Sequence, residues 1–355
     1  MRALILIGVS GSGKSTYVKS LIESSTENIH VYNADNYRIK MFGSLEMGNT
    51  HHENGKRVDP SKQVFKALNE DLDEDLDNAT DNDVFILDNM NLSRKRRRSF
   101  YEKFRSKHIP VEAHFFFASE ETINNNQSQR AAVSPGSYVK PYIIHDMVKT
   151  LQVPRLTVDC DEIICHGEKW FKKFRATEVN NLQELIDEVS DDNMKQTLTK
   201  NFAPHQCLPY HKESINEHID MCIVNSWQSP HDPLLHEEAI FHDLGKAICK
   251  EFTDESKHKI MESALLGVVL DKNDLNELTA HYLGHANVSA VIYMNYMFSN
   301  DAFGADNYQV LEAIYQHMNA HTGMGKKNIN VNKLDDKLLA QIEEFRKIDD
   351  KSRIA

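Results

Sequence analysis

One short segment near the start of the chain constrains its fold more than any other feature. Residues 8–15 read Gly-Val-Ser-Gly-Ser-Gly-Lys-Ser and match the pattern GxxxxGK[ST] in full. The segment follows an apolar run, Ala3 to Ile7, that suits a buried strand, and it precedes a helix-forming stretch, Ser15 to Ile22. Because such a loop turns its backbone N–H groups toward phosphate oxygens, it predicts a nucleotide-binding α/β domain.

The residues of this loop have distinct expected tasks. Lys14 is expected to reach the β and γ phosphates, and the Ser15 hydroxyl to ligate Mg²⁺. The predicted cofactors are therefore ATP, or another nucleoside triphosphate, and Mg²⁺. The predicted nucleotide contacts in the loop are Gly8, Ser10, Gly11, Ser12, Gly13, Lys14, Ser15 and Thr16.

The remaining sequence pattern divides the chain into two halves and a connector. Residues 1–165 alternate β-rich runs with helical patterns, which is typical of an α/β fold with a parallel sheet and crossover helices. Residues 166–203 are polar and charged and predict a helical connector. In residues 204–355 apolar positions recur at helical spacing without a clear strand, which predicts an all-α domain. The β-rich runs are Arg2 to Ile7, His30 to Tyr32, Val84 to Leu87, Val111 to Phe117 and Asp161 to Ile164.

Composition excludes several classes of protein. The 41 Lys and Arg against 53 Asp and Glu give a net charge of −12, which argues against coating of duplex nucleic acid by a basic face. The apolar runs are far shorter than the ~20 residues of a membrane span, so we expect no membrane association and a cytoplasmic location. The five cysteines form no CxxC pair and are interpreted as reduced, buried, small apolar residues. Of the 18 histidines, 11 follow residue 200, which suggests a metal site in the second half.

A carboxylate and an arginine follow the second predicted strand, in the segment Asn33-Ala34-Asp35-Asn36-Tyr37-Arg38. Their spacing puts Asp35 and Arg38 on the same face of a helical turn, at the edge of the sheet. A carboxylate there can accept the proton of an attacking hydroxyl, and the arginine can hold an anionic part of the acceptor. The alternative is an aspartate that caps the helix and a surface arginine.

These motifs resemble those of the polynucleotide 5′-kinase family of P-loop phosphotransferases, in which a GxxGSGKS loop is followed by a DxxR pair. The resemblance implies that Asp35 is the general base for a 5′-hydroxyl and that Arg38 contacts the phosphate next to the acceptor nucleoside. The turn Leu87-Asp88-Asn89-Met90-Asn91 is similar to the family's D-x-x-N turn and implies that Asp88 lies at the Mg²⁺ and nucleotide site.

The segment Gln127-Ser128-Gln129-Arg130 resembles the family's lid, which implies that Arg130 stabilises charge on the transferring phosphate. The lid differs from the family pattern at Asn126, where some members have a second basic residue. The run Arg94 to Arg98 has two interpretations: a basic surface that contacts the phosphates of a nucleic-acid backbone, or a solvated helix face. We favour the solvated helix face.

A second motif, Phe241-His242-Asp243-Leu244-Gly245-Lys246, pairs a histidine with an aspartate that can chelate one divalent metal. With Glu217-His218 upstream, it resembles the HD phosphohydrolase superfamily, whose pattern is H…HD…H…H…D. The resemblance implies one or two divalent transition metals, which can activate water and neutralise the charge that develops on a phosphate ester. The implied ligands are His218, His242, Asp243, His285, His317 and Asp349.

Some assignments in this half have competitors. Asp350 competes with Asp349, and His258, within the helical insertion Phe252 to His281, competes with His285. Lys246 is either a contact for substrate phosphate or a surface lysine. The remaining nearby histidines, interpreted as supporting or packing residues, are His211, His281 and His321.

Together the two resemblances predict a bifunctional enzyme that heals RNA or DNA ends. It would phosphorylate a 5′-hydroxyl and remove a 2′,3′-cyclic, 2′ or 3′ phosphate, leaving ends for a separate ligase. The alternatives are a nucleoside or nucleotide kinase fused to an HD nucleotidase, and a nucleotide-sensing regulator with an inactive HD domain. The sequence predicts neither the oligomeric state nor a preference for RNA or DNA.

Overall fold

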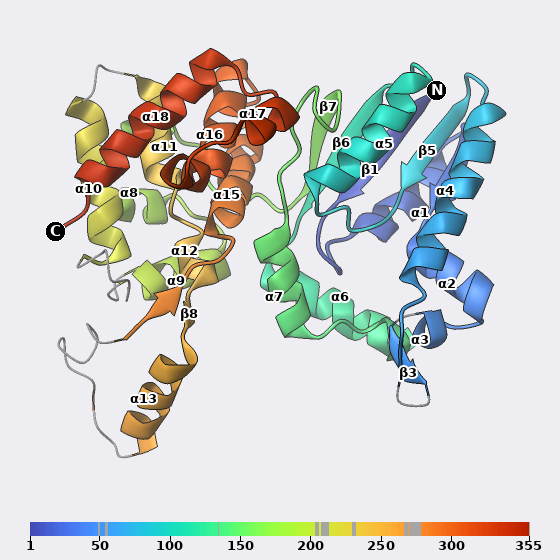
Figure 1. Cartoon of the computed structure of the whole chain (residues 1–355), viewed down its shortest axis with the longest axis horizontal. Helices are drawn as coiled ribbons and strands as arrows, with labels where there is room; N and C mark the ends of the chain where they lie inside the picture. Colours follow the sequence, from blue (N-terminus) through green and yellow to red (C-terminus); the bar gives the residue numbers. More distant parts are fainter. Residues whose placement is uncertain are drawn as a thin grey trace. The chain divides into compact units, whose positions relative to one another are not determined.

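The chain forms two compact units in a computed structural model that describes residues 1–48, 50–53, 56–133, 135–202, 206, 213–228, 232–265, 269 and 278–354. The first unit comprises Met1–Val148 and Pro154–Glu168, and the second comprises Lys149–Val153 and Lys169–Ala355 (Figure 1). Residues 169–202 thus belong to the second unit, where the sequence suggested a separate connector. There the Trp170 N–H donates to Asn295 Oδ1 at 2.8 Å.

A parallel sheet of five strands forms the centre of the first unit, in the order β2-β5-β1-β6-β7. The α/β class predicted for this half is therefore confirmed. Strands β1 and β5 are buried along almost their whole length, as expected where crossover helices cover both faces of a sheet. The strands are β1 (Arg2–Ile7), β2 (Asn28–Tyr32), β5 (Asp83–Leu87), β6 (Val111–Phe117) and β7 (Glu162–Gly167).

Helices connect these strands, and α5 packs against β6 (Figure 1). They are α1 (Lys14–Ser24), α2 (Ala34–Phe42), α3 (Leu45–Gly48), α4 (Ser61–Asp77), α5 (Arg94–Ser106), α6 (Glu120–Val133), α7 (Pro141–Thr150) and the 3₁₀ turn η1 (Pro135–Ser137). A short antiparallel pair that the sequence did not predict, β3 (His51–Glu53) and β4 (Lys56–Val58), lies between α3 and α4.

The strand order creates a crevice beside β1. Strand β5 pairs with one side of β1 and β6 with the other, so the connections on the two sides diverge at the carboxyl end of β1. Open α/β sheets bind ligands at such a point. The segments that follow β1, β2 and β5 carry Lys14, Asp35 and Asp88.

The second unit is mostly helical, with α16 and α18 side by side (Figure 1). Helix α15 is buried around almost its whole surface, which explains its long apolar sequence. The helices are α8 (Leu182–Asp187), α9 (Asp192–Phe202), α10 (Ile215–Gln228), α11 (Pro233–Phe241), α12 (Lys246–Cys249), α13 (Asp254–Leu265), α15 (His285–Asn300), α16 (Ala305–Thr322), α17 (Lys326–Asn332), α18 (Asp336–Lys351) and the 3₁₀ turn η2 (Ala176–Glu178).

The expectation of an all-α second half needs one correction. Strand β8 (Glu251–Phe252) pairs antiparallel with β9 (Ala280–His281). These two-residue strands join the two ends of the inserted segment, and they are too short to produce an alternating pattern in the sequence.

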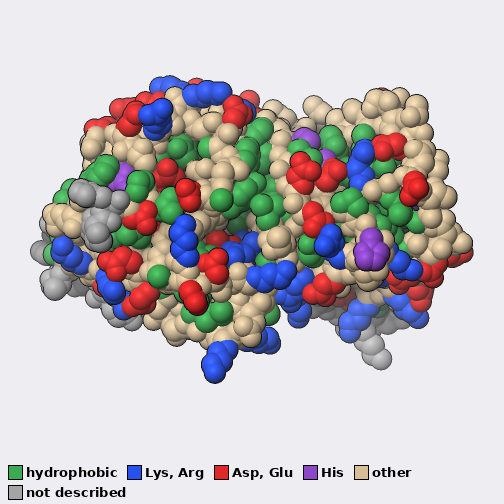
Figure 2. Space-filling model, turned by 90° about the horizontal axis from the view of Figure 1, so that it is seen from above, with side chains coloured by type: hydrophobic (Ala, Val, Ile, Leu, Met, Phe, Trp, Pro, Cys, Tyr) green, Lys and Arg blue, Asp and Glu red, His purple; other side chains and the backbone are tan. Residues whose placement is uncertain are grey.

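Two surface properties follow from the described helices and side chains. None of the described helices is both long and apolar enough to span a bilayer. Figure 2 shows acidic and basic side chains interspersed over the face that it displays.

Candidate nucleotide and metal sites

The glycine-rich loop holds the side chain of Lys14 against its own backbone. Gly13 has a left-handed φ of 93° where α1 begins, a conformation that glycine adopts without a steric penalty. The Lys14 Nζ donates to the carbonyls of Gly8 at 2.9 Å and Val9 at 2.7 Å. Burial is the main cause that lowers the pKa of Lys14 to about 8, and the Asp88 carboxylate opposes it. The loop therefore holds a buried amine where a polyphosphate is expected.

Oxygen donors suited to a hard cation lie beside this loop. The Ser15 hydroxyl donates to Asp88 Oδ2 at 3.0 Å, and the Asn33 amide donates to the same oxygen at 2.9 Å. A hydroxyl and a carboxylate are the ligand types that nucleotide-bound Mg²⁺ takes from P-loop proteins. Ser15 and Asp88 therefore fit the ion that the sequence implies.

The carboxylate of Asp35 lies between two arginines. Arg38 Nη1 is 2.8 Å from Asp35 Oδ1, and Arg130 Nη2 is 3.6 Å from Asp35 Oδ2. Arg130 also donates to Ser10 Oγ at 3.0 Å, so it contacts the loop and Asp35 together. The cap of α2 is Asn33, whose side chain accepts the N–H of Asp35 and of Asn36. Asp35 is therefore free of the capping role that was its alternative.

These side chains face one cavity of about 830 Å³ in the first unit. Its lining includes the predicted catalytic residues Lys14, Asp35, Arg38 and Arg130, together with Asp88. The Asn126 amide, at the position where the lid differs from the family pattern, donates to the Gly11 carbonyl at 2.7 Å. Asn126 therefore ties α6 to the phosphate-binding loop.

The basic run on α5 is not a solvated face throughout: that prediction was wrong for Arg94 and Arg97, which are buried, and for Arg96, which lines the cavity. Arg97 is fully buried, and its Nη2 lies 2.7 Å from Asp159 Oδ2. It also donates to the Asn91 carbonyl at 2.7 Å, which holds the turn after β5. The guanidinium of Arg96 lies 3.8 Å from the centre of the Phe65 ring, and both side chains line the cavity.

In the second unit, both carboxylate oxygens of Asp243 face histidines. Oδ2 lies 3.5 Å from His218 Nε2 and 3.4 Å from His242 Nε2. Oδ1 lies 3.4 Å from His285 Nε2 and 3.8 Å from His317 Nε2. Asp243 therefore lies between two pairs of imidazoles, each pair facing its own carboxylate oxygen.

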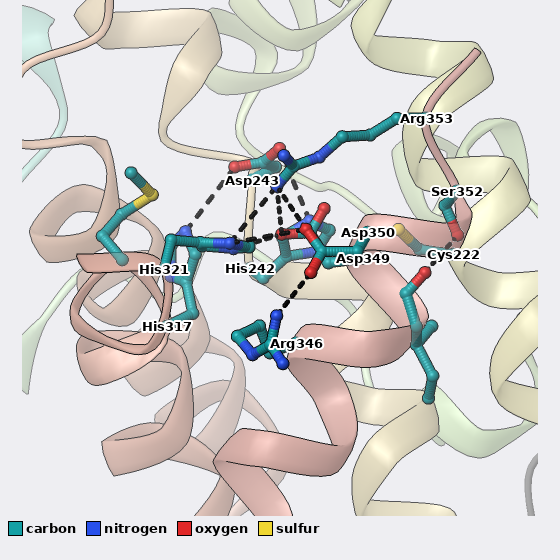
Figure 3. Close-up of polar contacts among 12 residues, drawn as sticks. Cys222, His242, Asp243, His317, His321, Arg346, Asp349, Asp350, Ser352 and Arg353 are labelled. Carbon is teal, nitrogen blue, oxygen red and sulfur yellow. Dashed lines mark hydrogen bonds and ion pairs between the residues drawn. The ribbon is translucent and has the colours of Figure 1, made fainter. Parts of the chain in front are cut away.

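The last implied ligand, Asp349 on α18, completes the first of these groups. Its Oδ1 is 3.1 Å from His218 Nε2, and Figure 3 shows the carboxylates of Asp243 and Asp349 among the histidine side chains. The side chain of Asp349 is 7% exposed, whereas that of the competing Asp350 is 39% exposed and pairs with Arg346 at 2.6 Å. The structure brings Asp349, and not Asp350, to the imidazole of His218.

Each of the four imidazoles is oriented by the backbone. Every Nδ1–H donates to a main-chain carbonyl and leaves Nε2 directed at the carboxylates, an arrangement typical of metal-binding histidines. The Nε2 of His242 is buried and has no hydrogen-bond partner among the described residues. These features fit one or two bound metal ions. The pairs are His218 with Ser352 at 3.2 Å, His242 with Ala239 at 3.0 Å, His285 with Tyr282 at 2.7 Å and His317 with Ile314 at 2.7 Å.

The other candidate residues take varied positions. Lys246 is buried and its Nζ is 2.6 Å from Asp243 Oδ2, so it is not a surface lysine. His321 Nε2 is 2.7 Å from Asp349 Oδ2. His258 is exposed on α13, and His281 lines the cavity beside the cluster. His211 lies outside the described residues.

A cavity of about 390 Å³ gives access to this cluster. Asp243, His285, His317 and Asp349 line it, together with Lys246 and Arg353, two cations suited to a substrate phosphate. Burial, followed by the neighbouring His285, lowers the pKa of His317 to about 3.

Glycine at position 245 has a packing role in the motif around Asp243. A Cβ there would lie 2.2 Å from the His285 carbonyl oxygen, and the Gly245 N–H donates to Ser289 Oγ at 2.8 Å. The turn after Asp243 therefore packs directly on the backbone of α15, which supplies His285.

Cys222 is a neighbour of the cluster that the sequence interpretation missed. Its Sγ is 3.7 Å from His218 Nε2, one helical turn away on α10. Burial alone would raise the pKa of the Cys222 thiol, but the imidazoles of His218 and His242 lower it to about 7. The spacing of four residues from His218 was the available signal.

The fold and the loop geometry define the first unit as a parallel-sheet α/β domain of the P-loop type. Residues 4–154, less than half of the chain, match the sequence profile of a family described as an AAA domain. A search of curated proteins found no match to the chain. Among solved structures, the chain is similar to Kti12 of Chaetomium thermophilum in complex with ADP-AlF3, with a TM-score of 0.36 and 14% identity, over 53% of this chain and 100% of that chain.

Proposed function

We propose that the protein heals nucleic-acid ends with two active sites. One site transfers the γ-phosphate of ATP to a 5′-hydroxyl end of RNA or DNA. The other is a metal-dependent phosphohydrolase of the HD type that removes a 2′,3′-cyclic, 2′ or 3′ phosphate. A separate ligase would then join the ends.

The observation that carries the kinase proposal is the position of Asp35 between Arg38 and Arg130, in the cavity that also contains Lys14. A half-exposed carboxylate there can orient an acceptor hydroxyl and accept its proton. Arg130 contacts the loop and Asp35 together, so it is placed to stabilise the phosphoryl group in transfer. Arg38 is placed to hold the phosphate beside the acceptor nucleoside.

The kinase proposal is tested with two matched substitutions. Asp35→Asn should lower the rate of phosphate transfer to a 5′-hydroxyl oligonucleotide by about 10²-fold or more, since it removes a proton acceptor. Asp71→Asn is the control, because Asp71 accepts the Tyr37 hydroxyl at 2.8 Å and does not line the cavity. Near-normal transfer by the Asp35→Asn protein would overturn the proposal.

A third substitution distinguishes a polymer end from a mononucleotide acceptor. Arg38→Gln should impair phosphorylation of oligonucleotides more than that of free nucleosides, because only the polymer has a phosphate for Arg38 to hold. Equal loss with both acceptors would instead favour the nucleoside or nucleotide kinase.

The observation that carries the phosphohydrolase proposal is that both oxygens of Asp243 face imidazole nitrogens. Metal ions bound there would activate water and neutralise charge on a phosphate ester. His218, His242, Asp243 and Asp349 would hold one ion, and Asp243, His285 and His317 a second. Lys246 and Arg353 would bind the substrate phosphate from the cavity wall.

Adjacent carboxylates on α18 provide the test. Asp349→Asn should reduce both metal content and release of phosphate, whereas Asp350→Asn should preserve metal content, because Asp350 pairs with Arg346 and not with the four imidazoles around Asp243. Metal content is measured by elemental analysis, and activity with oligonucleotides that end in a 3′-phosphate, 2′-phosphate or 2′,3′-cyclic phosphate. Full metal content without activity on any phosphate substrate would favour the nucleotide-sensing regulator.

A further inference from the structure

The surroundings of Cys222 differ from those of a packing cysteine. Cys222 is fully buried, on the same face of α10 as His218, and it lies beside Asp349 (Figure 3). Donor atoms of His218, Cys222, His242 and Asp349 all lie within 4.8 Å of one another. One of these donors, His242 Nε2, is buried without a hydrogen-bond partner among the described residues. The donor atoms of the four side chains therefore lie close enough together to bind one ion.

We propose that Cys222, in place of Asp243, is the fourth ligand of the metal ion held by His218, His242 and Asp349. This inference rests on the proposed metal centre and adds a sulfur donor to it. In binding, a bond forms between Sγ and the metal as the thiol proton passes to the buffer, and no oxidation or reduction takes place.

The distances between donor atoms match such a coordination sphere. With metal–nitrogen and metal–sulfur bonds of about 2.1 and 2.3 Å, tetrahedral geometry separates a nitrogen from a sulfur by about 3.6 Å. The distance from Cys222 Sγ to His218 Nε2 is 3.7 Å. The same geometry separates two nitrogen or oxygen donors by about 3.4 Å, and the distance from His218 Nε2 to Asp349 Oδ1 is 3.1 Å. The residues can thus close around one ion with small movements.

A sulfur donor changes the selectivity of the site among divalent metal ions. Two imidazoles with carboxylates alone suit many divalent ions, including Mn²⁺ and Fe²⁺. A thiolate among them favours softer ions such as Zn²⁺ and Co²⁺ and disfavours Mg²⁺. The second group, Asp243 with His285 and His317, contains no sulfur, so the two positions should differ in their preference for metals.

The test is a titration of the metal-free, full-length protein with Co²⁺ under reducing, oxygen-free conditions. Wild-type protein should develop the near-ultraviolet charge-transfer absorption of a thiolate bound to Co²⁺. Cys222→Ser should lack it, and Cys249→Ser should keep it, because Cys249 is a buried cysteine of the same unit outside the cluster. Zn²⁺ affinity should fall by about 100-fold or more in Cys222→Ser, since even outer partners of metal ligands contribute 10–100-fold.

A measurement on wild-type protein covers the case in which Cys222→Ser does not fold. X-ray absorption of the Zn²⁺ form should show a sulfur atom at about 2.3 Å from the metal, beside nitrogen and oxygen atoms. Binding of Co²⁺ and Zn²⁺ without a sulfur signal would overturn the role of Cys222 and leave the phosphohydrolase proposal standing. Failure of the wild-type protein to bind either ion would overturn both.

Discussion

The burial of Lys14 leads to a prediction about nucleotide binding and pH. Burial lowers the pKa of Lys14 to about 8 in the nucleotide-free protein, from an ordinary value of 10.5. Bound phosphates favour the charged ammonium, so the pKa should rise again when a nucleotide binds. Nucleotide binding should therefore take up a proton above pH 8, and affinity should fall as the pH rises through that value.

The size of the effect follows from the fraction of Lys14 that is charged. With a pKa of about 8, roughly nine-tenths of the free protein is charged at pH 7 and roughly one-tenth at pH 9. If the bound form titrates only above pH 10, the dissociation constant should rise by about tenfold between pH 7 and pH 9. Fluorescence titration with a labelled ADP measures this change, because the phosphates of ADP are fully ionised throughout the upper part of this range.

Lys14→Arg is the control for other groups that titrate in the same range. A guanidinium stays charged up to at least about pH 12, so binding by this variant should be weaker but almost independent of pH. An equally steep pH profile in wild-type and Lys14→Arg protein would refute the role of Lys14. A flat wild-type profile would refute the lowered pKa of Lys14.

Three further predictions concern residues that support the sites. Arg97→Met should destabilise the first unit by about 3–5 kcal/mol in denaturant unfolding, because Asp159 would remain as an uncompensated buried charge. Arg98→Met is the comparison and should cost less than about 1 kcal/mol, because Arg98 pairs with Glu102, whose side chain is 70% exposed. Burial raises the pKa of Glu238 to about 8, so between about pH 4.5 and pH 8 the folded protein holds a proton that the unfolded chain has released. The free energy of unfolding therefore falls as the pH rises through this range. Glu238→Gln removes the titrating group and should raise the melting temperature more at pH 8 than at pH 5. Gly245→Ala should destabilise the second unit by about 1–3 kcal/mol, because the new Cβ would collide with the backbone of α15. It should also weaken metal binding in a calorimetric titration. Unchanged metal affinity would contradict this packing role of Gly245.

The positions of residues that directly follow strands depend on local sequence. Lys14, Asp35 and Asp88 each follow a strand that the apolar pattern marks, and parallel strands bring their carboxyl ends to one edge. The proximity of these residues thus follows from the fold class alone.

Other positions depend on contacts that no local pattern records. A run of basic residues reads as solvated, and the burial of Arg97 depends on Asp159, 62 residues later in the chain. The choice between His285 and His258 as a metal ligand likewise depended on whether the inserted segment, which carries His258, packs against the cluster. Cys222 was interpreted, like the other cysteines, as a small apolar packing residue. Its spacing of four residues from His218, which predicts the same helix face, was visible in the sequence.

The path of the chain between the units constrains how they can be separated or exchanged. The chain passes from one unit to the other after residues 148, 153 and 168. Residues 149–153, which belong to the second unit, therefore precede β7 of the first unit in the sequence. A single proteolytic cut therefore cannot release a complete first unit without carrying these five residues along. A fusion that simply places one unit after the other would therefore not reproduce the path of this chain.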